Sequence, residues 1–208
     1  NGISKEKFDP DLRSALDRQT GVIMLLRMFG QEDEALLLSD ADANAKLAKF
    51  TDGGTVAAWA KKQVAYAVDK GLVKGIEIKG KFYFQPSAPL VGKAYALLIL
   101  QQLGYSGDFN YNESLTELAN AGGLTAIQAV SFDKGLIKDE VVGMTYNSLQ
   151  AKYKADGKTV IKALLDSGNV KKEDLEKAGI PYAEVKEVKP IRIDIALDGA
   201  DILKIMAY

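Results

Sequence analysis

The chain contains the octapeptide VDKGLVKG at residues 68–75, and a close copy, FDKGLIKD, follows 64 positions later at residues 132–139. Each copy ends a segment whose apolar residues recur every three or four positions, the spacing of a helix that packs against a core. A repeated unit of this size cannot bury its apolar face alone, so repeats of this kind stack on one another. The octapeptide therefore predicts one body built from related units.

A second recurrence links FDP at residues 8–10 to FQP at residues 84–86, 76 positions apart. Each is followed by a long apolar segment that stops at a glycine, Gly30 or Gly104, and such a glycine is a common left-handed helix cap. One unit thus reads as a short helix, a Gly-Leu-Val turn, a Phe-x-Pro loop and a long helix. The predicted body covers residues 1–185, with units at about residues 1–49, 50–119 and 120–185.

The pattern as a whole predicts a mostly α-helical protein. Helices are expected at about residues 18–29, 55–70, 92–103, 124–134, 139–155, 158–167 and 172–178. Alternation around Lys79-Gly80 predicts a short hairpin over residues 76–84. Apolar residues also alternate in the last segment, residues 186–208, which predicts a β-like C-terminal extension that either packs on the body or begins a downstream module.

Composition excludes several classes of function. The 208 residues include 27 Lys and Arg against 28 Asp and Glu, so there is no overall positive field to gather nucleic acid. The absence of Cys and His removes thiol and imidazole nucleophiles, Ser-His-Asp triads and zinc fingers. No uncharged stretch approaches the ~20 residues of a membrane span. We expect no enzyme, no nucleic-acid partner and no membrane insertion.

A calcium loop is imitated by Asp40, Asp42 and Asn44, but such a loop needs glycine at its sixth place and glutamate at its twelfth. Those places hold Ala45 and Thr51. The acids are better interpreted as the negatively charged first turn of a helix. No metal site and no cofactor are expected.

Five motifs follow one another in the middle unit: Phe50-x-Asp52, Trp59-Ala60, Gly71-Leu72-Val73-x-Gly75, Phe84-x-Pro86 and Leu103-Gly104-Tyr105. In this order they resemble the S-layer homology family, and the resemblance extends from about residue 8 to residue 179. It implies three helical units packed around a pseudo-threefold axis. It also implies non-covalent anchoring of an exported protein to the cell wall, through secondary wall polysaccharide that often carries a pyruvylated sugar.

The same resemblance implies a cation at the start of each long helix, where it meets the carboxylate of the sugar. Unit one has Arg18 there and unit three has Lys138. In unit two, counting back from Gly104 selects Gly92, whereas counting from the Phe-x-Pro loop selects Lys93. A helix start also offers unpaired N–H groups, and a charge-assisted bond there contributes ~1.5–3 kcal/mol.

Trp59 is the only tryptophan, and its indole offers a flat apolar face to a sugar ring. An equally open interpretation is a core aromatic between units. Asp52 is expected to cap the helix that carries Trp59. The predicted ligand-binding residues are therefore Arg18, Trp59, Lys93 and Lys138, with no catalytic residue.

Unit three departs from the pattern, because it lacks the Phe-x-Pro loop and has Gly123 where Trp59 would repeat. One or two working pockets are therefore expected. The predicted function is anchoring of a larger exported protein to the extracellular cell wall, with secondary wall polysaccharide or peptidoglycan as partner. The alternatives are a degenerate structural or protein-interaction domain at the cell surface without carbohydrate binding and, more weakly, a catalytic module that acts on wall glycan.

Overall fold

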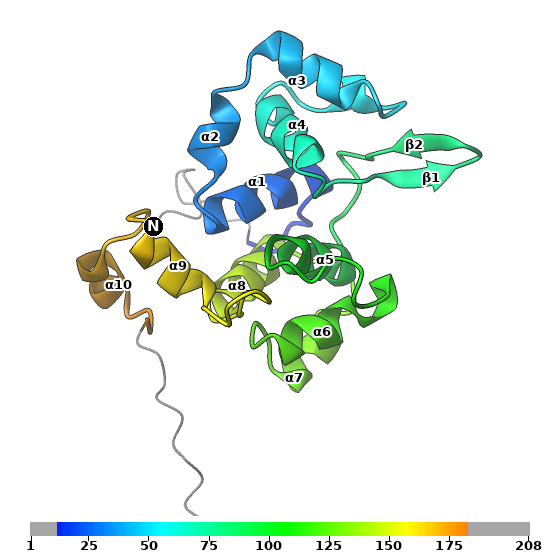
Figure 1. Cartoon of the computed structure of the whole chain (residues 1–208). Helices are drawn as coiled ribbons and strands as arrows, with labels where there is room; N and C mark the ends of the chain where they lie inside the picture. Colours follow the sequence, from blue (N-terminus) through cyan, green and yellow to red (C-terminus); the bar gives the residue numbers. More distant parts are fainter. Residues whose placement is uncertain (1–11, 183–208) are drawn as a thin grey trace, which may run out of the picture.

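The computed structural model describes residues 12–182 and confirms a mostly α-helical protein (Figure 1). The repeated loop at residues 8–10 and the predicted extension at residues 186–208 lie outside the described residues. The α-helices are α1 Arg18–Met28, α2 Glu32–Leu36, α3 Asp40–Leu47, α4 Lys61–Asp69, α5 Gly92–Gln102, α6 Ser114–Asn120, α7 Ala126–Ser131, α8 Lys138–Ser148, α9 Val160–Asp166 and α10 Lys172–Ala178. Short 3₁₀ helices cover Gly53–Thr55 and Tyr111–Glu113, and two strands, β1 Ile76–Ile78 and β2 Lys81–Tyr83, form a hairpin.

A closed ring of backbone hydrogen bonds joins the segments that lead into α1, α5 and α8. The N–H of Leu16 donates to the carbonyl of Leu136 (3.2 Å), that of Leu136 to Leu90 (2.8 Å), and that of Leu90 back to Leu16 (2.7 Å). All three leucine side chains are buried. The ring therefore brings the starts of the three longest helices together, and these helices lie through the middle of the molecule (Figure 1).

A second set of hydrogen bonds fixes which residue begins each of these helices. The N–H groups of Arg18, Gly92 and Lys138 donate to the carbonyls of Ala88, Lys134 and Ser14, at 3.0, 2.9 and 3.0 Å. Each of the three is the first residue of its helix. Counting back from Gly104 is thus the correct alignment, and Lys93 lies one position further into α5.

Several expected helices have different bounds in the structure. The helix expected at residues 55–70 is α4, which begins only at Lys61. A 3₁₀ turn occupies Gly53–Thr55, and no side chain caps α4. The helix expected to continue to residue 155 ends at Ser148. Gly30 and Gly104 do follow their helices, with φ of 69° and 89°, the left-handed conformation expected of such caps.

The expected helix ranges did not include the short helices α2, α3 and α6. Their five to eight residues are too few for an apolar period to stand out. The acids at Asp40 and Asp42 do lie in the first turn of α3, and the hydroxyl of Ser39 accepts a hydrogen bond from the N–H of Asp42. The interpretation of these acids as a helix start is confirmed.

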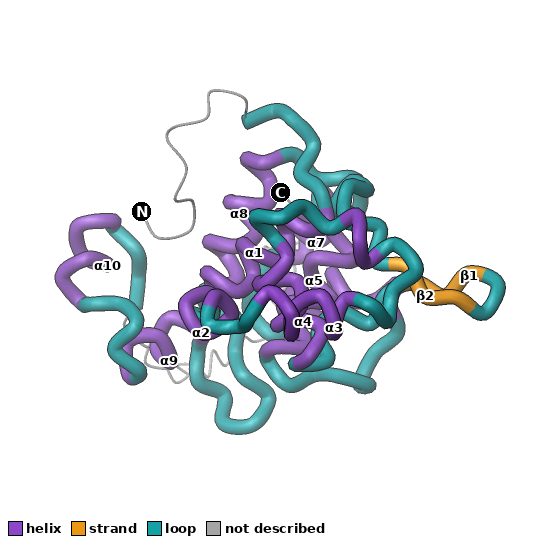
Figure 2. Tube along the Cα trace, turned by 90° about the horizontal axis from the view of Figure 1, so that it is seen from above, coloured by secondary structure: helices purple, strands orange, loops and turns teal. Residues whose placement is uncertain are grey.

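The predicted hairpin is present and projects from the helical body (Figures 1 and 2). Its antiparallel register pairs Ile76 with Tyr83 and Ile78 with Lys81. Lys79 and Gly80 form the turn, both with positive φ (51° and 75°), which is the conformation of a tight type I′ hairpin turn.

Gly92 supplies a test of the ring. A Cβ at this position would lie 1.9 Å from the carbonyl oxygen of Phe132, whereas a Cβ at Gly143 in α8 would have nothing within 4 Å. Gly92→Ala should therefore lower the free energy of unfolding by about 1–3 kcal/mol through overpacking. The control Gly143→Ala should raise it by about 0.5–1 kcal/mol, because alanine favours a helix. Urea titration of both variants measures this, and equal stabilities would contradict the close contact.

Candidate functional site

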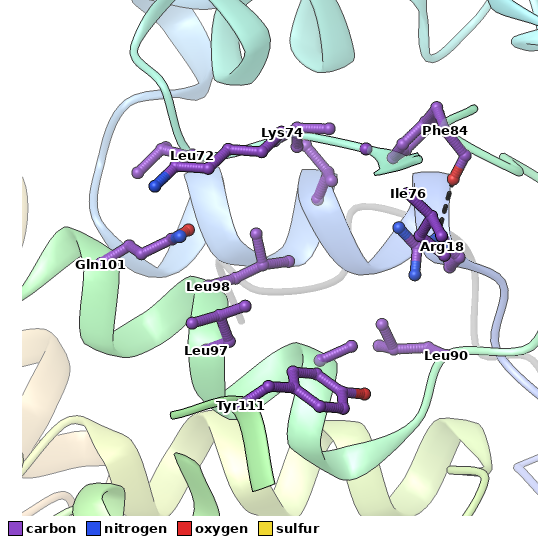
Figure 3. A pocket seen from close by; sticks show the side chains of 14 residues that line it. Arg18, Leu72, Lys74, Ile76, Phe84, Leu90, Leu97, Leu98, Gln101 and Tyr111 are labelled. Atoms are coloured by element: carbon purple, nitrogen blue, oxygen red, sulfur yellow. Dashed lines mark hydrogen bonds between the residues drawn. The ribbon is translucent and has the colours of Figure 1, made fainter. Parts of the chain in front are cut away.

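A cavity of about 410 Å³ opens beside the start of α1 (Figure 3). Its walls come from α1, from the Gly-Leu-Val turn after α4, from α5 and from the 3₁₀ helix at Tyr111–Glu113. The lining is mostly apolar and includes Val22, Leu72, Leu90, Leu97 and Leu98. A cavity of this size and character is typical of a small-ligand site.

Both charged side chains that line the cavity, Arg18 and Lys74, are cationic. None of the described residues in its wall is an aspartate or a glutamate. Because the walls are apolar, the field of these cations is screened less than it would be at an open surface. The cavity is therefore suited to an anionic group.

Arg18 is held in place by groups that leave much of its guanidinium available. Its Nε donates to the carbonyl of Phe84 at 2.9 Å, and the guanidinium carbon lies 5.6 Å from the centre of the Phe84 ring. Figure 3 shows the terminal nitrogens on the side of the cavity. Desolvation lowers the pKa of Arg18, opposed by charge interactions with Tyr111 and Asp52, but a guanidinium stays protonated in proteins.

Asp52 has a different role from the one expected. It does not cap the helix that carries Trp59; instead, its two carboxylate oxygens accept the backbone N–H groups of Phe84 (2.8 Å) and Gln85 (2.7 Å). Gln85 has a φ of 56°, a conformation that costs free energy for a residue with a side chain. The carboxylate therefore stabilises the bend that aims the Phe84 carbonyl at Arg18.

Two further residues of the cavity were missed by the sequence patterns. Tyr111 lies across the cavity from Leu72 in Figure 3 and is 46% exposed. The Oε1 atom of Gln101 is buried and has no hydrogen-bond partner in the described part of the chain. Tyr111 offers an aromatic face and Gln101 a free acceptor, and both groups suit a hydroxylated ring.

The other predicted ligand residues lie away from this cavity. Trp59 is 58% exposed, so its interpretation as a core aromatic is wrong, and it is not part of the cavity wall. The Nζ of Lys93 forms an ion pair with Oδ1 of Asp133 at 2.9 Å. Lys138 begins α8. Of the predicted site residues, only Arg18 lines the cavity.

Position 92 shows why the start of α5 has no counterpart of Arg18. The carbonyl of Phe132 occupies the space that a side chain would need, since a Cβ there would approach its oxygen to 1.9 Å. Neither arginine nor lysine fits without displacement of the backbone. The helix start is conserved in geometry between α1 and α5, but the cation is replaced by glycine.

Comparison with known proteins relates the chain to one family. The S-layer homology domain matches residues 49–90, the segment that contributes Asp52, the Gly-Leu-Val turn and Phe84 to the site. The chain is also 26% identical over 160 residues to the surface-layer 125 kDa protein of Lysinibacillus sphaericus. That match covers 74% of this chain but 12% of the relative. No solved structure matches significantly. Within residues 12–182, no helix is both long and apolar enough to cross a membrane.

The Asp52 contacts generate a stability prediction. Asp52→Asn should lower the free energy of unfolding by about 1–3 kcal/mol, because the amide NH₂ would face a backbone N–H that then loses its acceptor. Asp33→Asn removes the same charge at an exposed position and should change it by less than about 0.5 kcal/mol. Urea titration compares the two variants. Equal effects would mean that the hydrogen bonds accepted by Asp52 contribute nothing beyond the charge of its carboxylate.

Proposed function

The chain belongs to the S-layer homology family through residues 49–90, and from this premise we propose that it anchors an exported protein non-covalently by binding an acidic secondary cell-wall polysaccharide. Membership of this family places the chain outside the cell, at the cell wall and surface layer. The family is one of anchoring rather than catalytic domains. The relative is a far longer surface-layer protein, which supports a role as one part of a larger exported chain.

The observation that carries the proposal is the position of Arg18 in an apolar cavity whose charged lining is wholly cationic. A carboxylate on a sugar, such as a pyruvyl group, would meet the planar fork of the guanidinium at the start of α1. Charge-assisted hydrogen bonds of this kind contribute about 1.5–3 kcal/mol. An uncharged polymer would leave this partly desolvated cation without a counter-charge from the ligand.

Tyr111 and Gln101 give the cavity the further groups that a sugar needs. In the proposed complex the ring lies against Tyr111 and the leucines of α5, and a hydroxyl donates to the Oε1 of Gln101. Apolar faces with a few convergent polar groups are the usual composition of small-molecule sites. Tyr111 thus takes the role that the sequence suggested for Trp59.

We extend the proposal to the arrangement of three units, at about residues 1–49, 50–119 and 120–185, around a pseudo-threefold axis. The cyclic hydrogen bonds of Leu16, Leu90 and Leu136 support it, because each unit donates to one neighbour and accepts from the other. The cavity beside Arg18 is the proposed working pocket. Ligand roles for Trp59, Lys93 and Lys138 stay predictions.

The test is retention on cell-wall sacculi of the producing organism, compared with sacculi stripped of their secondary polymer by acid. The unaltered chain should bind intact sacculi, lose binding on stripped ones and bind less as salt rises, because screening weakens the carboxylate contact. Arg18→Glu should reduce retention to background, and Arg18→Lys should fall between, since lysine lacks the fork. Lys171→Glu makes the same charge reversal at the exposed residue that precedes α10 and should bind normally.

Each other outcome contradicts the proposal in a recognisable way. Equal binding to intact and stripped sacculi would identify peptidoglycan as the partner instead of the polysaccharide. Full retention of Arg18→Glu would mean that the polymer does not bind in the cavity beside α1. Failure of the unaltered chain to bind either preparation would favour a domain that keeps the fold for contacts with another protein.

A further inference from the structure

The β1–β2 hairpin continues the wall of the cavity outwards. Ile76 both lines the cavity and begins β1, so the edge of the site and the base of the hairpin are the same residue. From there the hairpin projects away from the helices in two perpendicular views (Figures 1 and 2). A ligand longer than the cavity would meet the hairpin as it leaves.

The strand register divides the hairpin into two faces of different character. Side chains directly opposite each other in an antiparallel pair point to the same side, and successive residues alternate. Ile76, Tyr83, Ile78 and Lys81 therefore share one face, which we call the groove face because it includes Ile76. The other face holds the pair Glu77 and Phe82.

The groove face combines exposed apolar surface with positive charge. Ile76 and Ile78 are 41% and 43% exposed, so both present apolar surface to solvent. The nearby charges, Lys74 at the cavity and Lys81 on the hairpin, are cationic, and the acid of the hairpin, Glu77, lies on the opposite face. The groove face thus has the same character as the cavity: apolar surface with cations.

The base of the hairpin is firmly attached, which fixes the direction of this face. The N–H of Thr51 donates to the carbonyl of Phe82 at 2.8 Å, and Asp52 holds the two residues that follow β2. Gly75 packs so closely on the ring of Phe50 that a Cβ would lie 2.4 Å from it. An isolated two-stranded hairpin is marginal in water, so these contacts allow the exposed face to keep its shape.

We propose that the groove face is a second subsite, which binds the sugar residues adjoining the one held by Arg18. Rings of the polymer lie across Ile76, Ile78 and Tyr83, and Lys81 pairs with the next acidic group along the chain. The proposal rests on the proposed function, because it requires the same acidic polysaccharide. It predicts that the length of the polymer matters for affinity.

The experiment measures affinity by titration calorimetry for the acid-released wall polysaccharide, once as long chains and once as fragments of a few sugars. Ile78→Ser and Lys81→Glu should each weaken binding of long chains by about twofold to fivefold, the range of an exposed contact or ion pair. Neither should change the affinity for the short fragments, which fill the cavity alone. Phe82→Ser, an equally exposed position on the opposite face, is the matched control and should bind both normally.

Arg18→Glu separates this inference from the proposed function. Loss of all binding in Arg18→Glu, with unchanged long-chain affinity in Ile78→Ser and Lys81→Glu, overturns the second subsite and leaves the first intact. Intact binding in Arg18→Glu overturns the proposed function itself. An equal loss in Phe82→Ser would show that the effect does not depend on the groove face and would also overturn the inference. Thermal unfolding of every variant confirms that the hairpin substitutions leave the body folded.

Discussion

The rest of the structure depends on the ring of hydrogen bonds among Leu16, Leu90 and Leu136. Three chain segments that are far apart in sequence each donate one N–H and accept one in return, so no buried backbone group of the ring is left unpaired. The three leucine side chains fill the space around it. Each ring segment leads directly into a long helix, so the ring also fixes the first residue of α1, α5 and α8. It thereby fixes where the side chain at each helix start lies.

The starts of α1 and α5 have similar backbone hydrogen bonds but differ in the space around them. At the start of α1 the surrounding segments leave a cavity, and Arg18 lines it. At the start of α5 the backbone at Phe132 lies so close that only glycine fits at position 92. The start of α1 is thus open to a side chain, whereas the start of α5 is closed. The difference comes from the segment that packs on each helix start, residues 84–88 at α1 and residues 132–134 at α5, rather than from the helix itself.

Much of this scaffold could be predicted from sequence, because the signals are local. The glycines after the helices predicted where α1 and α5 end, alternation around Lys79-Gly80 predicted the hairpin, and the family resemblance selected Arg18 as a cation at a helix start. Asp52 and Tyr111 could not be assigned in this way. Asp52 contacts Phe84 and Gln85 some thirty residues away, and Tyr111 reaches the cavity from a short 3₁₀ turn, so neither position carries a periodic or local signal. The exposure of Trp59 depends on tertiary packing, so the sequence could not decide between a core aromatic and an exposed one.

The charge of the cavity depends on which groups the carboxylate of Asp52 contacts. Asp52 is close enough to influence Arg18, and an ion pair between them would offset the charge of the guanidinium. Both oxygens of Asp52 instead accept backbone N–H groups of the Phe84 bend. The same bend then turns the Phe84 carbonyl towards the Nε of Arg18, which fixes the guanidinium without cancelling its charge. The carboxylate therefore positions the cation through the backbone, and the terminal nitrogens remain directed at the cavity, where an acidic ligand can neutralise them.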